Sequence, residues 1–348
     1  MSRKLVLIVV GGVVVSCVAA LALLALVGYA DPVFQWAQRR QAMMAVRGGP
    51  EIVLEVDADA VQRRAYDLLR RDVVSRLRSA RVSFTTRVTG AGIEISAQPD
   101  DRQTAMAELR GHFGDTADIK LADDGTVRIG FTAAGLSERV GEAAERSRDV
   151  IERRLADLGM KVLVTVQPRE SGARLVVQMA RTDDPKQLIA FATKPGELGF
   201  RLIDVSMAPQ NALASPPSNA EVLYGRPESG KEPYLVDKRV IVSGLDLTDA
   251  QPGYDQRTNE PIVSFRFNIA GARKFAQATT ENVGRPFAIV VDGEVLSAPV
   301  IREPITGGSG QISGNFTAQS ASALAAVLRH GELPARLKVI EERPAKGQ

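Results

Sequence analysis

The sequence predicts an α+β protein that follows an N-terminal membrane anchor. Three observations predict this class: a length of 348 residues, an uncharged apolar segment near the N-terminus, and strand and helix patterns that recur loosely in the order β, α, β, β, α, β. That order is the ferredoxin-like arrangement, an antiparallel sheet with helices on one side. We therefore expect one transmembrane helix, then ferredoxin-like base modules with an inserted α+β head lobe.

The anchor is predicted at residues 5–29, which contain no charged side chain. An apolar helix of this length can span a hydrocarbon layer about 30 Å thick with some tilt. Cleavage near residues 28–30 is an alternative, but a cleaved signal peptide usually has a shorter apolar run. Residues 1–4 are then a cytoplasmic tail, and residues 30–46 link the anchor to the exported part.

Residues 47–131 are expected to form a first α+β module. Residues 51–57 alternate apolar and acidic side chains as a half-buried strand does, and Asp59 can cap the next helix. The apolar stripe of that helix is Val61, Ala65, Leu68, Leu69, Val73 and Leu77. Acids interspersed among its arginines favour a solvated face over a patch for anionic lipid or nucleic acid. A hairpin, a helix and a strand pair follow at residues 82–97, 102–112 and 119–131.

Residues 132–204 and 317–343 are expected to form the ferredoxin-like base. A helical stripe runs from Leu136 to Leu158 and stops at Gly159. Asp184 caps a helix with proline at its first position. The other predicted elements are a hairpin, a strand, a helix capped by Thr317 and a final strand that rejoins the sheet, at residues 161–179, 197–204, 318–329 and 336–341.

Residues 205–316 are expected to be the inserted head lobe, which begins with a loop at residues 205–218. Its densest signal is a hairpin in which Asp292 and Gly293 supply the two positive-φ residues of a type I′ turn. Glycines at 307, 308 and 310 are expected to form a flexible loop. They do not form a phosphate-binding loop, because the Lys-Ser/Thr pair is missing. Strands, a loop and a helix are predicted at residues 239–242 and 262–267, at 248–260, and at 271–281.

The sequence provides little material for catalysis or metal binding. His112 and His330 each close a predicted helix beside a glycine, where an imidazole can meet the last carbonyls. The single cysteine, Cys17, lies in the apolar segment, so a Cys-His pair or a zinc site of Cys and His ligands is not expected. The formal charge of +3 gives no strong preference for nucleic acid. We expect no enzymatic activity, catalytic residue, metal or cofactor.

Several stretches together resemble the SecD family of protein-export membrane proteins. The RGG triplet at residues 47–49 and the LEVD strand ending at residue 57 look like a motif of that family, although Ala-Val replaces Asp-Leu before it. Residues 151–159 and 199–202 are similar to a helix and a strand of the family, and the block from 292 to 343 matches in order. The motif residues, expected to be structural, are Arg47, Gly48, Gly49, Asp57, Asp292, Gly293, Pro299, Gly307, Gly308, Gly310 and Gly314.

The resemblance implies a role in bacterial protein export, with a single-pass anchor in the inner membrane and the bulk of the chain in the periplasm. The head would contact the emerging preprotein by strand addition and apolar side chains, and would change orientation about hinges at residues 205–218 and near Phe316. Implied partners are a SecF-like subunit, the SecYEG channel, unfolded preprotein and the membrane, with no nucleic acid. Family members continue into further membrane helices, whereas residues 344–348 are a polar tail. The alternative is therefore a membrane-anchored envelope adaptor, or a shortened paralogue without transport activity.

Overall fold

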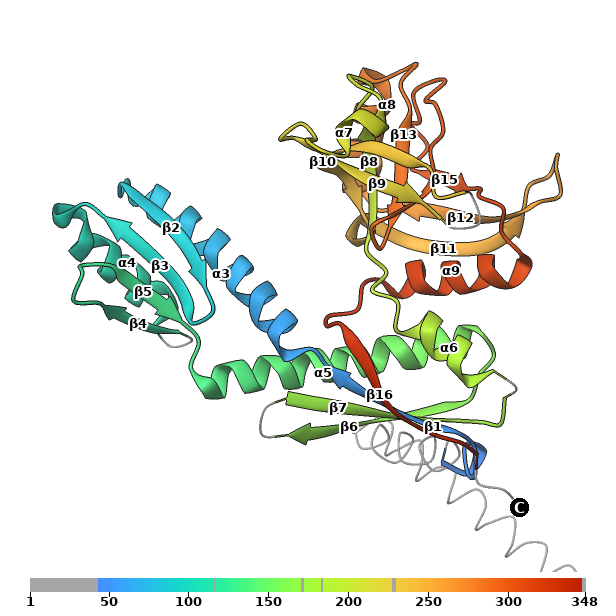
Figure 1. Ribbon diagram of the computed structural model, residues 1–348, viewed down its shortest axis with the longest axis horizontal. Coiled ribbons are helices and arrows are strands. Elements are labelled where there is room, and N and C mark those ends of the chain that lie inside the picture. Colours follow the sequence, from blue (N-terminus) through green and yellow to red (C-terminus); the bar gives the residue numbers. More distant parts are fainter. Residues whose placement is uncertain (1–42, 115–116, 170–171, 183, 227–229, 346–348) are drawn as a thin grey trace, which may run out of the picture.

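The structure, a computed structural model, describes residues 43–114, 117–169, 172–182, 184–226 and 230–345 (Figure 1). Within these residues the chain is a mixed α and β protein whose strands form three open sheets and one closed barrel. A base, a small module and a head each have a large buried cluster. No helix in the described part of the chain is long and apolar enough to cross a membrane, and the predicted anchor lies outside that part.

The base is a four-stranded antiparallel sheet with two helices on one face (Figure 1). Its elements are β1 Glu51–Val56, α5 Ala133–Asp157, β6 Val162–Arg169, β7 Gly172–Met179, α6 Pro185–Ala192 and β16 Leu337–Arg343. The strands lie in the order β16-β1-β7-β6. This chain order is the βαββαβ arrangement that the sequence predicts. The last strand rejoins the base sheet, as expected, but it does so by pairing with β1.

Strand β1 and the helix after it differ from the prediction. The sequence assigns residues 51–57 to the first module, but β1 pairs with β7 and β16 in the base sheet. Alternation along a strand shows which side chains are buried and does not identify its partner. Helix α3 (Ala58–Ser79) is capped by Asp57 instead of Asp59, because Ala60 N donates to the Asp57 carboxylate at 2.9 Å. This hydrogen bond is the main cause that lowers the pKa of Asp57.

The small module is inserted between β1 and α5. With α3 it contains β2 Phe84–Thr89, β3 Gly92–Ala97, a 3-10 turn Pro99–Asp101, α4 Arg102–Phe113, β4 Asp118–Leu121 and β5 Val127–Gly130. The strands lie in the order β2-β3-β5-β4, and α3 and α4 share their buried cluster. On α3 the buried face includes Tyr66, while Leu68 is 51% exposed, contrary to the predicted stripe. Stacking of Tyr66 on Phe131, with ring centroids 5.4 Å apart, accounts for this rotation of the face.

The head is inserted between α6 and β16. Its closed barrel consists of β8 Leu198–Ile203, β9 Ala220–Gly225, β10 Pro233–Ser243, β13 Phe287–Val291 and β14 Glu294–Ser297. Its three-stranded sheet consists of β11 Leu247–Tyr254, β12 Pro261–Phe267 and β15 Ser309–Ile312. The helical elements are α7 Pro209–Ala212, a 3-10 turn Gly244–Asp246, α8 Ile269–Glu281 and α9 Ala318–His330.

Aromatic packing places two predicted base elements in the head. Phe200 on β8 lies at the centre of a cluster of phenylalanine rings with centroids 5.3 to 6.2 Å from its own. Leu324 and Leu328 of α9 belong to the same buried cluster. The expected loop at residues 248–260 also differs, because most of it forms β11. Its Pro and Gly lower its strand propensity, and pairing with β12 overrides this.

Candidate functional site

The outer edge of β11 is closed to another strand. Asp255 N donates to Glu260 O at 2.9 Å across the turn into β12, so the alternate residues Ala250 and Pro252 direct their backbone groups away from β12. Arg329 Nε on α9 donates to Ala250 O at 2.9 Å. Pro252 has no N–H to donate. A side chain and a proline therefore obstruct two of the three outward-facing positions of β11, and the third, Tyr254, is its last residue.

The outer edge of β15 is open. Phe267 N donates to Gly308 O at 2.8 Å, which fixes the register of β15 on β12. Because backbone groups alternate in direction, Ser309 and Gln311 direct their N–H and C=O groups away from β12. Both residues are exposed, and the hydrogen bonds found among the described residues leave those outward groups unpaired. This edge can accept a further strand.

A trough crosses the exposed face of the same sheet and reaches the β15 edge. It has a volume of about 530 Å³ and is lined by Asp249, Gln251, Ser264, Phe265, Arg266, Ser309, Gly310 and Gln311. Most of these side chains occupy alternate positions of β11, β12 and β15, while the intervening positions face the core. The lining combines four polar uncharged side chains with one acid, one arginine, one phenylalanine and one glycine, a mixture that suits contact with polypeptide of varied sequence.

Three glycines of the predicted motif determine the path of β15. Gly308 has φ 63°, and a Cβ there would lie 2.9 Å from a side chain of α8. A Cβ on Gly310 would lie 2.6 Å from Cζ of Phe265, and one on Gly314 would lie 3.0 Å from a carbonyl of β14. The sequence predicts a flexible loop here, but Gly310 is part of the strand because the missing side chain lets β15 approach the core.

Two connections join the base to the head, at residues 193–197 and 331–336. Arg154 on α5 is 1% exposed and contacts both of them. Its Nη atoms donate to four carbonyls, those of Ala192, Lys194, Pro195 and Gly331. Burial lowers the pKa of Arg154 to about 10, an effect that Asp292 opposes, so the guanidinium is charged at neutral pH. We call this contact the arginine clasp.

The Asp292–Gly293 turn of the head holds the first connection from its other side. Asp292 and Gly293 have φ values of 54° and 82°, as the predicted type I′ turn requires. Asp292 N donates to Glu197 O at 3.0 Å, and Glu197 N donates to the Asp292 carboxylate at 2.8 Å. The turn therefore attaches the barrel to the connection beside the arginine clasp.

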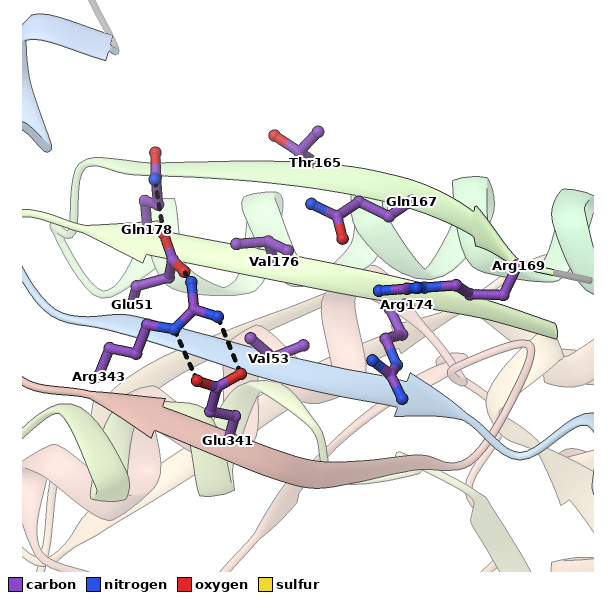
Figure 2. Close-up of a pocket in the computed structure, with 10 residues that line it drawn as sticks. All are labelled: Glu51, Val53, Thr165, Gln167, Arg169, Arg174, Val176, Gln178, Glu341 and Arg343. Atoms are coloured by element: carbon purple, nitrogen blue, oxygen red, sulfur yellow. Dashed lines mark hydrogen bonds and ion pairs between the residues drawn. The ribbon is translucent and has the colours of Figure 1, made fainter.

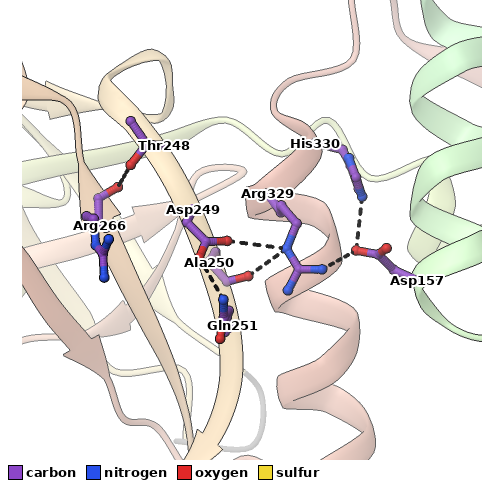
Figure 3. A network of polar contacts seen from close by, with 8 residues as sticks. All are labelled: Asp157, Thr248, Asp249, Ala250, Gln251, Arg266, Arg329 and His330. Carbon is purple, nitrogen blue, oxygen red and sulfur yellow. Dashed lines mark hydrogen bonds and ion pairs between the residues drawn. The ribbon is translucent and has the colours of Figure 1, made fainter.

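A second polar contact between base and head lies nearer the surface (Figure 3). Asp157 at the end of α5 accepts from Arg329 Nη1 at 2.7 Å and lies 3.0 Å from His330 Nε2. Arg329 also lies 3.6 Å from the Asp249 carboxylate on β11. His330 is in the last turn of α9, as predicted, and faces Asp157. This outer contact links α5, α9 and β11.

The open face of the base sheet carries paired charges (Figure 2). Arg343 donates to both carboxylate oxygens of Glu341, at 2.7 and 2.9 Å, and also to Glu51. Gln178 Nε2 donates to Glu51 at 2.8 Å. The hydrogen bond from Arg343 lowers the pKa of Glu341. A hollow of about 280 Å³ surrounds them. These charges neutralise one another, which makes this face a weaker candidate site than the β15 edge.

The remaining motif residues are distributed between base and head. Arg47 is exposed, Gly48 has φ 76°, and a Cβ on Gly49 would lie 1.9 Å from a carbonyl of β7. Gly307 is exposed in the segment before β15. Pro299 lies outside the named strands and accepts a hydrogen bond from β13 through its carbonyl at 3.0 Å. Their expected structural role stays a prediction.

The sequence predictions missed Arg154 and Arg329 as joining residues. Arg154 lies three residues after Ile151 and one before Leu155, so it is a charge on the apolar stripe of α5. Such a charge is rarely buried unless it is paired or hydrogen-bonded, and this signal could have identified it. No group of three or more His, Cys, Asp or Glu side chains suited to a metal ion is found in the described ranges.

Comparison with known proteins shows similarity to one family. A model of the SecDF P1 head subdomain matches residues 220–335. The protein translocase subunit SecD of Acetobacter pasteurianus is 34% identical over 322 residues, which cover 90% of this chain and 60% of that protein. The SecD of Rickettsia bellii is 30% identical over 300 residues, covering 86% and 57% of the two chains.

A solved structure of SecDF, described as a membrane component that enhances protein export, is 31% identical in sequence. The match covers 57% of this chain and 92% of that chain, with a TM-score of 0.44. The chain spans about 60% of the length of the curated relatives it matches.

Proposed function

The chain belongs to the SecD family, and we propose that it is an accessory component of bacterial Sec protein translocation that binds translocating preprotein on the periplasmic side. The observation that carries the proposal is the open β15 edge with its adjoining trough. The comparisons support the translocation role through relatives whose names state it. Binding through β15 is the part that this chain's own geometry adds.

Strand addition suits a preprotein because it recognises main-chain groups and tolerates varied side chains. Ser309 and Gln311 provide two N–H and two C=O groups on the free edge. At about 1 kcal/mol net for each hydrogen bond, the edge contributes about 4 kcal/mol, the binding free energy of a millimolar complex. A contact this weak would hold a moving chain briefly and then release it.

The placement in the cell and the partners follow from the same proposal. Residues 5–29 would anchor the chain in the inner membrane, with the base and head in the periplasm. A SecF-like subunit and the SecYEG channel would be its protein partners. The glycines Gly308, Gly310 and Gly314 would keep β15 at the surface of the head. The role requires binding and no bond-breaking chemistry, so we propose that the chain is not an enzyme.

Site-specific photo-crosslinking in spheroplasts with a stalled export substrate tests this proposal. A photoreactive residue at Gln311 should crosslink to the substrate, and one at Tyr254 on the closed edge serves as the matched control. Equal crosslinking from both positions would contradict binding at the β15 edge. Crosslinks from Gln311 only to unrelated envelope proteins would instead favour the adaptor alternative.

A further inference from the structure

Two rows of side chains cross the exposed face of the β11–β12–β15 sheet. The first row contains Asp249, Arg266 and Ser309, and the second, two residues along each strand, contains Gln251, Ser264 and Gln311. Both rows line the trough and end at the open β15 edge. Because side chains alternate between the two faces of a sheet, a strand added at that edge would extend each row by one residue.

The acid of the first row already has partners, whereas the arginine beside it has no acidic partner. Gln251 Nε2 donates to the Asp249 carboxylate at 2.8 Å, and Arg329 Nε lies 3.6 Å from that carboxylate (Figure 3). Arg266 lies opposite Asp249 on β12, but the ion pairs found among the described residues do not include it. Its side chain is exposed, so the lining of the trough includes a cation that an incoming acid can meet.

The short side chain of Ser309 leaves Arg266 a path to the open edge. Ser309 is the neighbour of Arg266 on β15, and it is the only residue of the row between Arg266 and an added strand. Strands lie about 4.8 Å apart, so the added strand would lie about 10 Å from β12 and about 14 Å from β11. Long side chains that extend toward each other can meet across the first distance. The second exceeds the Debye length of about 8 Å, so solvent ions largely screen the charge of Asp249 there.

We propose that Arg266 gives the β15 edge a preference for extended polypeptide segments that carry Asp or Glu at the position beside Ser309. This preference rests on the strand addition proposed above and adds a side-chain specificity to it. The backbone of β15 holds the segment, and the Arg266 guanidinium pairs with its carboxylate, for which a planar fork of donors is suited. Gln311 provides an amide donor and acceptor for a polar side chain two residues along the segment. A lysine beside Ser309 would meet a like charge and weaken binding.

Titration of the full chain with three fluorine-labelled peptides tests the proposal, and fluorine NMR is suited to weak binding of this kind. Each peptide alternates threonine with one guest residue, which is Glu, Gln or Lys. Because side chains alternate along a strand, all guests of a bound peptide lie on one face of the sheet. The Glu peptide should bind about two- to fivefold more tightly than the Gln peptide, the range expected for an exposed ion pair. The Lys peptide should bind more weakly than the Gln peptide.

Variants separate the specificity of Arg266 from binding at the edge. Arg266→Gln should bind the Glu and Gln peptides equally, whereas Arg257→Gln, the same change at an exposed arginine of the β11–β12 turn, should retain the preference. Added salt should reduce the preference of the parent. Equal binding of the two peptides by the parent, or a preference that survives in Arg266→Gln, would overturn the specificity and leave strand addition standing. Failure of all three peptides to bind, or undiminished binding by Gln311→Pro, would overturn the β15 edge as the binding site and the specificity with it.

Discussion

The two edges of the β11–β12–β15 sheet differ although they flank the same central strand. At β11, Pro252 has no outward N–H to donate, and Arg329 donates to the outward carbonyl of Ala250. At β15, by contrast, the outward backbone groups belong to Ser309 and Gln311, which are both exposed. An exposed strand edge is a site for unwanted pairing, and proteins commonly block it. One edge of this sheet is obstructed and the other is not, and this difference favours β15 as a binding edge.

The closed edge also connects to the base, while the open edge does not. Arg329 joins Ala250 of β11 to Asp157 of α5 in the outer contact (Figure 3). The β15 edge makes no such link among the described residues. A segment bound at β15 would therefore contact the head and not the base.

The largest effect is expected from proline at the open edge. Gln311→Pro removes an N–H that faces away from β12, so the β12–β15 ladder is retained while strand addition is blocked. Binding of a fluorescently labelled unfolded export substrate to the purified chain, measured by anisotropy, should fall to background. Gln311→Ala retains the N–H and should bind as the parent does. Loss of binding in both variants would show that the side chain, not the backbone edge, makes the contact.

A smaller effect on stability distinguishes the two edge strands. Gly310→Ala on β15 places a Cβ 2.6 Å from the Phe265 ring and should lower the unfolding free energy by about 1 to 2 kcal/mol. Gly253→Ala on β11 places a Cβ 4.0 Å from Ile262 Cγ1, an ordinary contact, and should be neutral or slightly stabilising. Urea denaturation of both variants measures the difference. Equal stabilities would contradict the close packing of β15 on the core.

Local elements were predictable from sequence because their signals are local. The Asp292–Gly293 turn follows from two residue types, and the start of α9 follows from Thr317, whose side chain accepts from Ser320 N at 3.1 Å. The helices α5 and α6 and the β6–β7 hairpin between them also followed, since these elements have clear periodicity. Three of the motif glycines lie around β15, but the open edge was not predictable. It depends on which backbone groups face outward, and pairing with β12 decides this.

Assignments that depend on distant partners could not be predicted. Strand β1 appeared to belong to the elements that follow it, and β8 to those that precede it, because sequence position was the only guide. The roles of Arg154 and Arg329 depend on carbonyls that lie far along the chain. A guanidinium that binds backbone leaves no residue-type signal at the other end of the contact.

The smallest expected effect concerns the turn that joins β11 to β12. The Asp255 carboxylate accepts from Thr258 N at 3.0 Å and Arg257 N at 2.8 Å, and these hydrogen bonds lower the pKa of Asp255. A carboxyl whose folded pKa is lowered stabilises the fold fully above its unfolded pKa, and this contribution is lost as the pH falls through the folded value. The parent should therefore be slightly more stable than Asp255→Ala at neutral pH, and the difference should shrink below about pH 4. Urea denaturation of both proteins across this range measures it. A stability difference that grows on acidification would contradict the hydrogen bonds to the Asp255 carboxylate. Binding of unfolded substrate should not change, because β15 lies on the opposite edge of the sheet.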